Sequence, residues 1–340
     1  MAEQAIEVLC TIPFNEAQTR RLEEASGRLQ LTVLPARRLD DIPAEVWARA
    51  EVLYTDRVLP QPAQVPNLRW LQFHYAGIDF AVESPLVQKV GLMVTTLSGA
   101  AAPQAAEHAL MMMLALGHHL PEMWVFQARA EWPRDRAERF SPLELRDSTV
   151  GIVGYGSIGR ELARLLLPFG ACVLAAKRDV MQPKDAGYTI QGMGDVDGDL
   201  FVRLYPIQAM KSMIKDCDFV VVALPLTPST RGIFNAEAFA AMKPGAYLVD
   251  IGRGNVVDPT ALLQALQEKR IAGAGLDVFS EEPLPSSSPL WKMPNVLISP
   301  HVAGISPRYL ERAAELFAEN LKRYAGGLPL LNQYETERGY

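Results

Sequence analysis

The feature of this 340-residue chain that most constrains its fold is a cluster of three glycines between two segments of different periodicity. Residues 154–159 read Gly-Tyr-Gly-Ser-Ile-Gly. The apolar run Thr149–Val153 before them is typical of a buried strand, and the apolar residues after them recur at helical spacing. A strand, a glycine-rich turn and a helix in this order begin a βαβ unit.

Each glycine of this pattern has a physical role in binding a dinucleotide. Gly154 permits the tight turn, Gly156 lets a pyrophosphate approach the backbone, and Gly159 lets helix and strand pack closely. N–H groups at the helix start can then bind the phosphates. The alternative is a glycine-rich turn in an α/β protein that binds no nucleotide, and the flanking strand and helix make it the weaker hypothesis.

Strand-like runs form two series along the chain, separated by amphipathic stretches such as Glu16–Ser26, which predicts two parallel sheets. The first series is Ile6–Ile12, Leu31–Leu34, Val52–Tyr54, Leu68–Phe73 and Leu92–Thr96, and the second is Thr149–Gly154, Cys172–Ala176, Phe219–Leu224, Ala246–Ile251, Ala274–Val278 and Val296–Ser299. Six runs in the second series are what a doubly wound dinucleotide fold requires. The chain length also fits two domains.

Two helical segments lie outside these series. We interpret the long helix predicted at Ala105–Leu120, with the polar segment Arg129–Arg139 after it, as a connection between two domains. The last helix is expected to start at a Ser306 cap with Pro307 in its first turn, and to end at the glycine pair 326–327.

The stretch Met181–Tyr205 is long for a connection between strands, and we interpret it as an insertion. Within it, Asp195–Asp199 resembles the start of a calcium loop, but the expected glycine is displaced and Pro206 stands where a bidentate Glu is needed. Turn chemistry favours a hairpin turn instead. No metal site is expected.

Composition and charge exclude several classes of partner. The net charge is −6 and no basic stripe could follow a phosphate backbone, so nucleic acid is not expected. The most apolar helical stretch, Ala109–Leu116, is too short to span a membrane, and Met1–Gln4 lacks the features of a signal peptide. Cys10, Cys172 and Cys217 have no metal-like spacing and suggest reduced thiols. These observations predict a soluble cytoplasmic protein.

Three polar segments follow predicted strands at the sheet edge where α/β proteins bind ligands. They are Leu248–Gly254, Gly275–Pro283 and Ile298–Gly304. Taken singly, His301 could be a core histidine, Arg253 a loop cation and Glu282 a solvated carboxylate. Taken together, a base, an orienting carboxylate and an anion-binding group at one edge predict a catalytic site.

With these segments the sequence resembles the D-isomer-specific 2-hydroxyacid dehydrogenases. Nearly the whole chain takes part in the resemblance. Besides the three polar segments and Thr149–Arg160, it includes Tyr75–Asp79 as the substrate loop, Ala106–His108 on the inter-domain helix, and Leu224–Gly232.

The resemblance implies a fold of two doubly wound parallel-sheet domains, with a Rossmann-type cofactor domain inserted into a flavodoxin-like substrate domain. Residues 1–103 and 305–340 would form the discontinuous substrate domain and residues 104–304 the cofactor domain. The active site would lie in a cleft between the domains. The family also implies a homodimer formed through the cofactor domain.

The resemblance further implies catalytic roles. His301 would give the proton to the carbonyl oxygen of a 2-oxoacid, since histidine is the side chain whose ordinary pKa lies nearest neutrality. Glu282 would accept the other ring N–H of His301 and favour the imidazolium, and Arg253 would bind the substrate carboxylate with its planar fork. The substrate would also contact Tyr75, Ala76 and Gly77, with His74 shaping the pocket.

The expected cofactor is NADP(H), favoured over NAD(H). Its expected contacts are Gly154, Gly156, Ser157, Ile158, Gly159, Lys177, Arg178, Leu224, Pro225, Thr230, Ile251, Gly252, Arg253, Asp277, His301, Ala303 and Gly304. NAD-specific enzymes place Asp or Glu after the second strand, whereas Lys177 and Arg178 stand there in this chain. The alternative is that Asp179 accepts the ribose hydroxyls, and spacing alone leaves it open.

Two other functions compete with reduction of a small 2-oxoacid such as glyoxylate or hydroxypyruvate. One is oxidation of another small anion, formate or phosphite, within the same family, and Glu282 speaks against formate because formate dehydrogenases pair their histidine with glutamine. The other is a dinucleotide-sensing interaction protein like the corepressors that share this fold. No extended interaction tail is visible in the sequence.

Overall fold

The protein is described here by a computed structural model covering residues 5–335. The segment Met1–Gln4, on which the expected absence of a signal peptide depends, and residues 336–340 of the expected substrate domain lie outside the described residues. The chain divides into two compact units. Unit 1 contains the described residues up to Ala101 together with those from Ser306 onward, and unit 2 is Ala102–Ile305.

Unit 1 is built on a five-stranded parallel sheet with the strand order β2-β1-β3-β4-β5. Its strands are β1 (Ile6–Cys10), β2 (Leu29–Val33), β3 (Val52–Thr55), β4 (Trp70–Phe73) and β5 (Met93–Thr95). This is the flavodoxin-like order, and all five strands lie where the apolar runs predict them.

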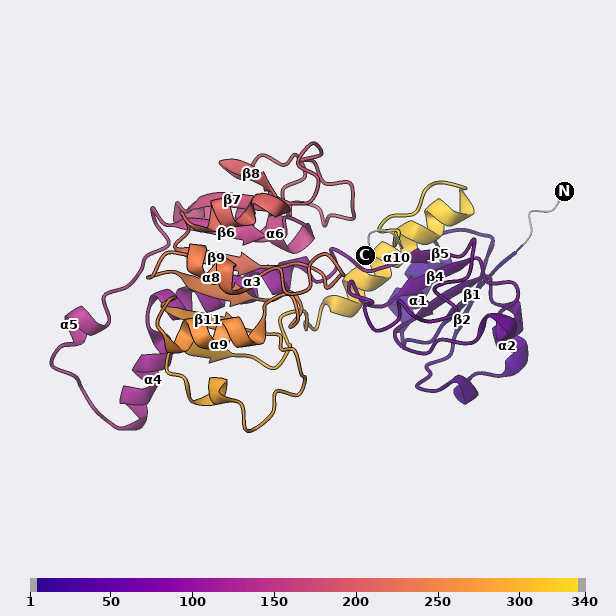
Figure 1. The fold of residues 1–340 in the computed structure, drawn as a ribbon. Helices are drawn as coiled ribbons and strands as arrows, with labels where there is room; N and C mark the ends of the chain where they lie inside the picture. The colour runs from indigo at the N-terminus through magenta and orange to yellow at the C-terminus, as the bar shows by residue number, and fades with distance from the viewer. Residues whose placement is uncertain (1–4, 336–340) are drawn as a thin grey trace. The chain divides into compact units, whose positions relative to one another are not determined.

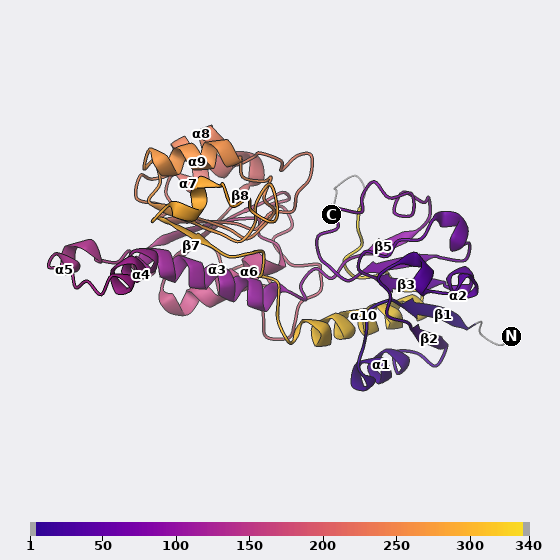
Figure 2. The same ribbon diagram turned by 90° about the horizontal axis from the view of Figure 1, so that it is seen from below.

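Helices α1 (Glu16–Glu23), α2 (Ala44–Arg49) and α10 (Tyr309–Ala325) pack on this sheet. Figure 2 shows α1 and α10 together on one face. Phe317 of α10 buries its ring against Tyr54 and Trp70, at centroid distances of 4.6 and 5.4 Å. The C-terminal helix thus completes the core of the N-terminal sheet.

The start of α10 differs from the expectation. The helix begins at Tyr309, and Ser306 instead closes a turn before it, accepting from the Arg308 N–H with Oγ (3.1 Å) and from the Tyr309 N–H with its carbonyl (3.0 Å). The prediction that Ser306 caps α10 is therefore wrong, because the Ser306 hydroxyl accepts its hydrogen bond within the turn that precedes the helix. The predicted end is confirmed, since Gly326 is the C-cap residue.

Unit 2 is built on a seven-stranded parallel sheet with the order β12-β11-β10-β9-β6-β7-β8. Its strands are β6 (Thr149–Val153), β7 (Cys172–Lys177), β8 (Arg203–Pro206), β9 (Phe219–Val222), β10 (Tyr247–Asp250), β11 (Gly273–Leu276) and β12 (Val296–Ile298). Counted from β6, this is the Rossmann order with one added strand, so the expected fold class is confirmed.

Strand β8 is the strand that the sequence did not predict. It lies at the sheet edge beside β7, within the segment interpreted as an insertion. Of its four residues, Arg203-Leu204-Tyr205-Pro206, one is buried, so no apolar run marks it. In the Asp195–Asp199 stretch the Asp195 carboxylate accepts from the N–H groups of Gly198 and Asp199, which forms a turn, but the turn joins no antiparallel strands, so the expected hairpin is wrong.

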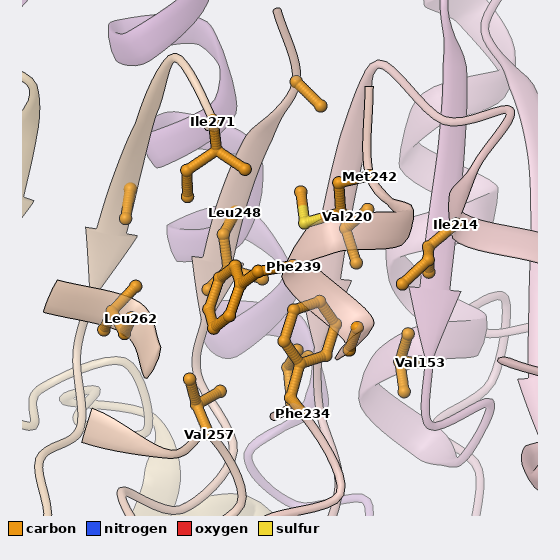
Figure 3. Close-up of a cluster of buried hydrophobic side chains, with 14 of the residues drawn as sticks. Val153, Ile214, Val220, Phe234, Phe239, Met242, Leu248, Val257, Leu262 and Ile271 are labelled. Carbon is orange, nitrogen blue, oxygen red and sulfur yellow. The ribbon is translucent and has the colours of Figure 1, made fainter. Parts of the chain in front are cut away.

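Helices cover both faces of the unit 2 sheet. They are α3 (Ala102–Gly117), α4 (Leu120–Ala128), α5 (Arg136–Arg139), α6 (Ser157–Leu166), α7 (Met210–Ile214), α8 (Ala236–Ala241) and α9 (Pro259–Gln267). Figure 2 shows α3 and α6 on one face and α7, α8 and α9 on the other. Figure 3 shows the second layer, where Phe234, Phe239 and Leu248 pack together.

Residues 120–140, which contain α4 and α5 and which we name the arm, belong to unit 2. Figure 1 shows α4 and α5 projecting from the remainder of that unit. The interpretation of Arg129–Arg139 as a connection between domains is therefore wrong. Among the described residues, no helix combines the length and apolar character that crossing a membrane requires.

Candidate active site

Three neighbouring strands of unit 2 end at the same sheet edge and lead into the predicted catalytic segments. Strands β10, β11 and β12 lie side by side in parallel. Arg253 follows β10, Glu282 follows β11 and His301 follows β12. Because parallel strands present their carboxyl ends together, the fold brings these segments to one edge.

His301 and Glu282 form a direct side-chain pair. Nδ1 of His301 lies 2.7 Å from Oε2 of Glu282, and the two side chains are 42% and 36% exposed. The other carboxylate oxygen, Oε1, accepts from the Phe279 N–H at 2.9 Å. Since a carboxylate only accepts, Nδ1 of His301 carries the donated hydrogen and Nε2 is left for a substrate.

Asp277 anchors the backbone of the His301 loop. Its carbonyl accepts from the His301 N–H at 2.9 Å, and its carboxylate accepts from the N–H groups of Val302 and Ala303, both at 2.9 Å. The Ser299 hydroxyl donates to the same carboxylate at 2.5 Å. Asp277 is 1% exposed, so these bonds form in a dry environment in which they are strong.

Arg253 lies on a loop whose glycines are required by close backbone packing. A Cβ on Gly252 would lie 2.8 Å from the Leu224 carbonyl oxygen, and one on Gly254 would lie 1.9 Å from backbone atoms of Phe279. Arg253 is half-buried, and its guanidinium donates to the Gly252 carbonyl at 2.9 Å. The tight packing fixes the backbone from which the guanidinium projects.

Asp250 lies at the end of β10, before this loop, and is 2% exposed. Burial raises the pKa of its carboxyl group, a hydrogen bond from the Gly252 N–H lowers it, and the nearby Asp277 raises it; the resulting pKa is about 8. A carboxyl group with this pKa holds its proton at neutral pH.

The glycine motif fits a dinucleotide, and the structure separates the roles of its glycines. Gly154 has φ +110°, and its Cβ would lie 2.6 Å from the Ala223 carbonyl oxygen. A Cβ on Gly159 would lie 2.4 Å from the Gly154 carbonyl oxygen. Around Gly156, by contrast, no atom of residues 5–335 beyond its chain neighbours lies within 4 Å of a Cβ position. The fold therefore requires the outer two glycines, and the open space at Gly156 fits the approach of a pyrophosphate to the start of α6.

The Thr230 hydroxyl has a structural partner within its own turn. It donates to the Pro225 carbonyl at 2.6 Å and accepts from the Thr227 N–H at 2.8 Å. Three further expected contacts, Leu224, Ile251 and Ala303, are buried. The Gly304 carbonyl accepts a hydrogen bond from the Gln104 side-chain amide at 2.8 Å. These expected cofactor contacts thus lie on loops that follow the carboxyl ends of the strands.

The end of β7 carries Lys177, followed by the exposed residues Arg178 and Asp179. The ammonium of Lys177 donates to the Gln182 carbonyl at 2.5 Å. Partial burial and the neighbouring Arg160 lower the pKa of Lys177. Asp179 accepts from the Met181 N–H at 3.0 Å, which closes the turn after the strand.

Arg160 and Asp195 form hydrogen bonds that hold the stretch before β8 against the glycine motif and the start of α6. Sequence reasoning predicted neither contact. The Arg160 guanidinium is 1% exposed and donates to the carbonyls of Asp195 and Pro183, both at 2.5 Å. The Asp195 carboxylate accepts from the Tyr155 hydroxyl at 2.7 Å. An arginine directly after the third glycine carries no signal of burial, so the sequence could not reveal this contact.

The expected substrate loop lies in unit 1, after β4. Tyr75 and Ala76 are exposed, and the Tyr75 carbonyl accepts from the Leu97 N–H at 3.1 Å. His74 beside them is held by the Tyr54 hydroxyl, 2.6 Å from its Nδ1, and by the Tyr309 hydroxyl, which donates to its carbonyl at 2.6 Å. Burial lowers the pKa of His74 to about 4, so its ring is neutral at neutral pH.

No group of three or more His, Cys, Asp or Glu side chains that could hold a metal ion occurs within residues 5–335. The expected site residues are distributed over the two units. Arg253, Glu282, His301 and the cofactor contacts belong to unit 2, and Tyr75, Ala76 and Gly77 belong to unit 1.

Comparison with known proteins gives consistent matches. Residues 110–303 match the family model for the NAD binding domain of D-isomer specific 2-hydroxyacid dehydrogenases. A glyoxylate reductase of Pyrococcus furiosus is 34% identical over 266 residues, which cover 77% of this chain and 74% of the relative.

Two solved structures resemble both units. One is a D-isomer specific 2-hydroxyacid dehydrogenase from Xanthobacter autotrophicus in complex with NADPH and MES, with a TM-score of 0.77, 30% identity, and coverage of 99% of this chain and 100% of that one. The other is an NADPH-dependent glyoxylate/hydroxypyruvate reductase from Sinorhizobium meliloti in complex with NADP and sulfate. Its TM-score is 0.76 at 25% identity, with coverage of 98% and 100%.

Proposed function

This chain belongs to the D-isomer specific 2-hydroxyacid dehydrogenase family and is an oxidoreductase, and we propose that it reduces a small 2-oxoacid to the D-2-hydroxyacid with NADPH. The observation that carries this proposal is the 2.7 Å contact between His301 and Glu282 at the edge where β10, β11 and β12 end. A histidine oriented by a carboxylate beside a dinucleotide-binding motif is suited to proton transfer coupled to hydride transfer.

We assign the proton transfer to Nε2 of His301. Glu282 accepts the Nδ1 hydrogen, which fixes the orientation of the ring and stabilises the imidazolium. Arg253 binds the substrate carboxylate and polarises the carbonyl, because its planar guanidinium can make two parallel hydrogen bonds. A bound reduced nicotinamide supplies the hydride. The proposed contacts of Tyr75, Ala76 and Gly77 are with the substrate carboxylate.

We propose glyoxylate or hydroxypyruvate as the substrate class. The named reductases that this chain resembles support this choice. The test is to measure consumption of NADPH and of NADH with glyoxylate, hydroxypyruvate, pyruvate and bulkier 2-oxoacids. The proposal expects turnover with at least one of the first two, and absence of turnover with every 2-oxoacid would overturn it.

For the cofactor we propose a preference for NADPH over NADH. Two cations, Lys177 as the last residue of β7 and Arg178 directly after it, stand where NAD-specific enzymes place an acidic residue. Asp179 is already engaged in closing the turn after the strand, which weakens its assignment as the ribose acceptor. The complexes of similar structures with NADPH and NADP support the same preference.

We also propose that the protein is a homodimer formed through the arm of unit 2. The arm projects from the remainder of unit 2 (Figure 1). It carries four large apolar side chains, Met123, Trp124, Val125 and Trp132, that are between 37% and 83% exposed. A cluster of this kind marks an interaction surface.

The dimer is tested by light scattering on the purified chain. We expect the mass of two chains, and we expect the double change Trp124→Ser with Trp132→Ser to give the mass of one chain. Trp291→Ser is the matched control, because Trp291 is 50% exposed but lies outside the arm. A monomeric wild type, or an unaltered mass in the double variant, would contradict this assignment.

A further inference from the structure

His108 on α3 contacts the group that anchors the His301 loop. Its Nε2 lies 2.9 Å from the Ser299 hydroxyl and 3.6 Å from the Asp277 carboxylate. The His108 side chain is 16% exposed and Asp277 is 1% exposed. His108 and Ser299 are 191 residues apart in sequence, so only the fold brings these groups together.

The direction of the hydrogen bonds follows from counting protons. The Ser299 hydroxyl has one hydrogen, and it donates that hydrogen to Oδ1 of Asp277 at 2.5 Å. The contact between Ser299 and His108 therefore needs its hydrogen from the ring, which places it on Nε2 of His108. The result is a directed chain in which His108 donates to Ser299 and Ser299 donates to Asp277.

Asp277 connects this chain of hydrogen bonds to the backbone of the segment that contains His301. It accepts from three consecutive N–H groups, with its carbonyl from His301 and with its carboxylate from Val302 and Ala303. His301 has φ +52°, in the left-handed region that is unfavourable for a residue with a Cβ. Such a conformation persists only where surrounding contacts hold it.

We propose that His108 and Ser299 are positioning residues, which act through Asp277 to hold His301 in its left-handed conformation and thereby keep its ring on Glu282. This inference rests on the proposed function, because it assigns His301 the proton transfer. Without the His108 donor, the Ser299 hydroxyl can rotate away from Asp277. The Asp277 carboxylate, which holds the backbone of residues 301–303, then loses its hydrogen bond from Ser299. Nε2 of His301 then spends less time in the productive orientation.

The test compares two substitutions at His108 with a control on the same segment. His108→Leu removes the donor and should lower kcat for 2-oxoacid reduction up to about tenfold, the upper end of the effect expected for one hydrogen bond to a neutral hydroxyl group. The dissociation constant for NADPH, measured by fluorescence titration, should change less than twofold. His108→Gln keeps an N–H donor and should recover most of the lost turnover. His118→Leu, at an exposed histidine after α3, should leave kcat unchanged.

A double-substitution cycle separates positioning from general damage. Ser299→Ala should lower kcat to a similar extent as His108→Leu, and the two together should cost no more than either alone, because they interrupt one chain. Wild-type kcat in His108→Leu, equal losses in His108→Gln and His108→Leu, or additive losses in the double variant would each overturn the inference. Inactivity of the wild type on every 2-oxoacid would instead overturn the proposed function.

Discussion

The proposed proton transfer depends on how firmly the ring of His301 is held in one orientation. One ring nitrogen is bound to Glu282 at 2.7 Å, and the main-chain N–H is bound to Asp277 at 2.9 Å. The ring is therefore fixed at both its side chain and its backbone, although 42% of the side chain is exposed. Exposure and fixed orientation together are what a group needs to exchange protons with a substrate and with water.

Replacement of His301 by Asn should lower kcat by about 100- to 10,000-fold, the usual contribution of acid–base catalysis. The binding of NADPH should remain within a few fold, because the glycine motif that is proposed to bind the phosphates is unchanged. Steady-state kinetics and fluorescence titration measure the two quantities, with His118→Asn as the control. Near-normal turnover in His301→Asn would remove this residue from the mechanism.

Arg253→Lys should lower kcat/KM for a 2-oxoacid by about tenfold or more. Lysine keeps the positive charge, but it loses the planar pair of donors that can bind a carboxylate at two points. Both kcat and the apparent affinity should fall, since the same group binds the substrate and polarises its carbonyl. An unchanged specificity constant in this variant would show that Arg253 has another role.

At the scale of elements, the proposed preference for NADPH depends on the residues at the end of β7. Lys177 is partly buried and donates to the Gln182 carbonyl, whereas Arg178 is exposed beyond the strand end. The two cations are therefore not equivalent, although the sequence alone presents them as a pair. We assign the larger part of the preference to Arg178.

Arg178→Ala should accordingly lower kcat/KM with NADPH about tenfold and leave the value with NADH nearly unchanged, because a charge-assisted bond to the 2′-phosphate is lost. Lys177→Met should have a smaller effect on the same ratio. The measurement is the ratio of specificity constants for the two cofactors with one 2-oxoacid. A wild type that prefers NADH, or a larger effect at Lys177, would contradict the assignment.

The elements also show what could be predicted from the sequence and what could not. Within residues 5–335, eleven of the twelve strands lie at apolar runs, and ten of these eleven contain buried residues. Strand β8 was missed because Arg203 and Pro206 leave only two apolar residues between them. Ser306 was misassigned because the same hydroxyl can cap a helix or close the turn before it.

Within the site, local sequence patterns predicted the positions of some residues and not of others. The spacing of Glu282 and His301 after successive strands predicted their proximity, and the structure confirms it. The contacts of His108 with Ser299 and of Arg160 with Asp195 depend on the packing of a helix against distant chain, which no local pattern encodes. Sequence reasoning therefore found the groups proposed to react and missed the groups that hold their surroundings.

At the scale of the whole molecule, Asp250 couples stability to pH. Burial raises the pKa of its carboxyl group to about 8, whereas the unfolded chain has an ordinary pKa near 4. Between these values the folded protein keeps a proton that the unfolded chain releases, so rising pH favours unfolding by up to about 1.4 kcal/mol per pH unit. Below about pH 4 the two states bind the same proton and this cost vanishes.

Asp250→Asn should therefore raise the thermal unfolding midpoint at pH 8 and leave it nearly unchanged at pH 4.5, because the amide cannot ionise and can still accept from the Gly252 N–H. Asp216→Asn, at an exposed aspartate of the same unit, is the control and should have little effect at either pH. Parallel pH profiles for Asp250→Asn and the wild type would refute the assignment.

We propose that this chain transfers hydride from NADPH to a 2-oxoacid, with His301 as the proton donor. The most direct test is to incubate the enzyme with NADPH and hydroxypyruvate and to determine the amount and configuration of the glycerate formed. We expect one D-glycerate for each NADPH oxidised, and almost none with His301→Asn. Formation of L-glycerate, or binding of NADPH without turnover on any 2-oxoacid, would contradict it.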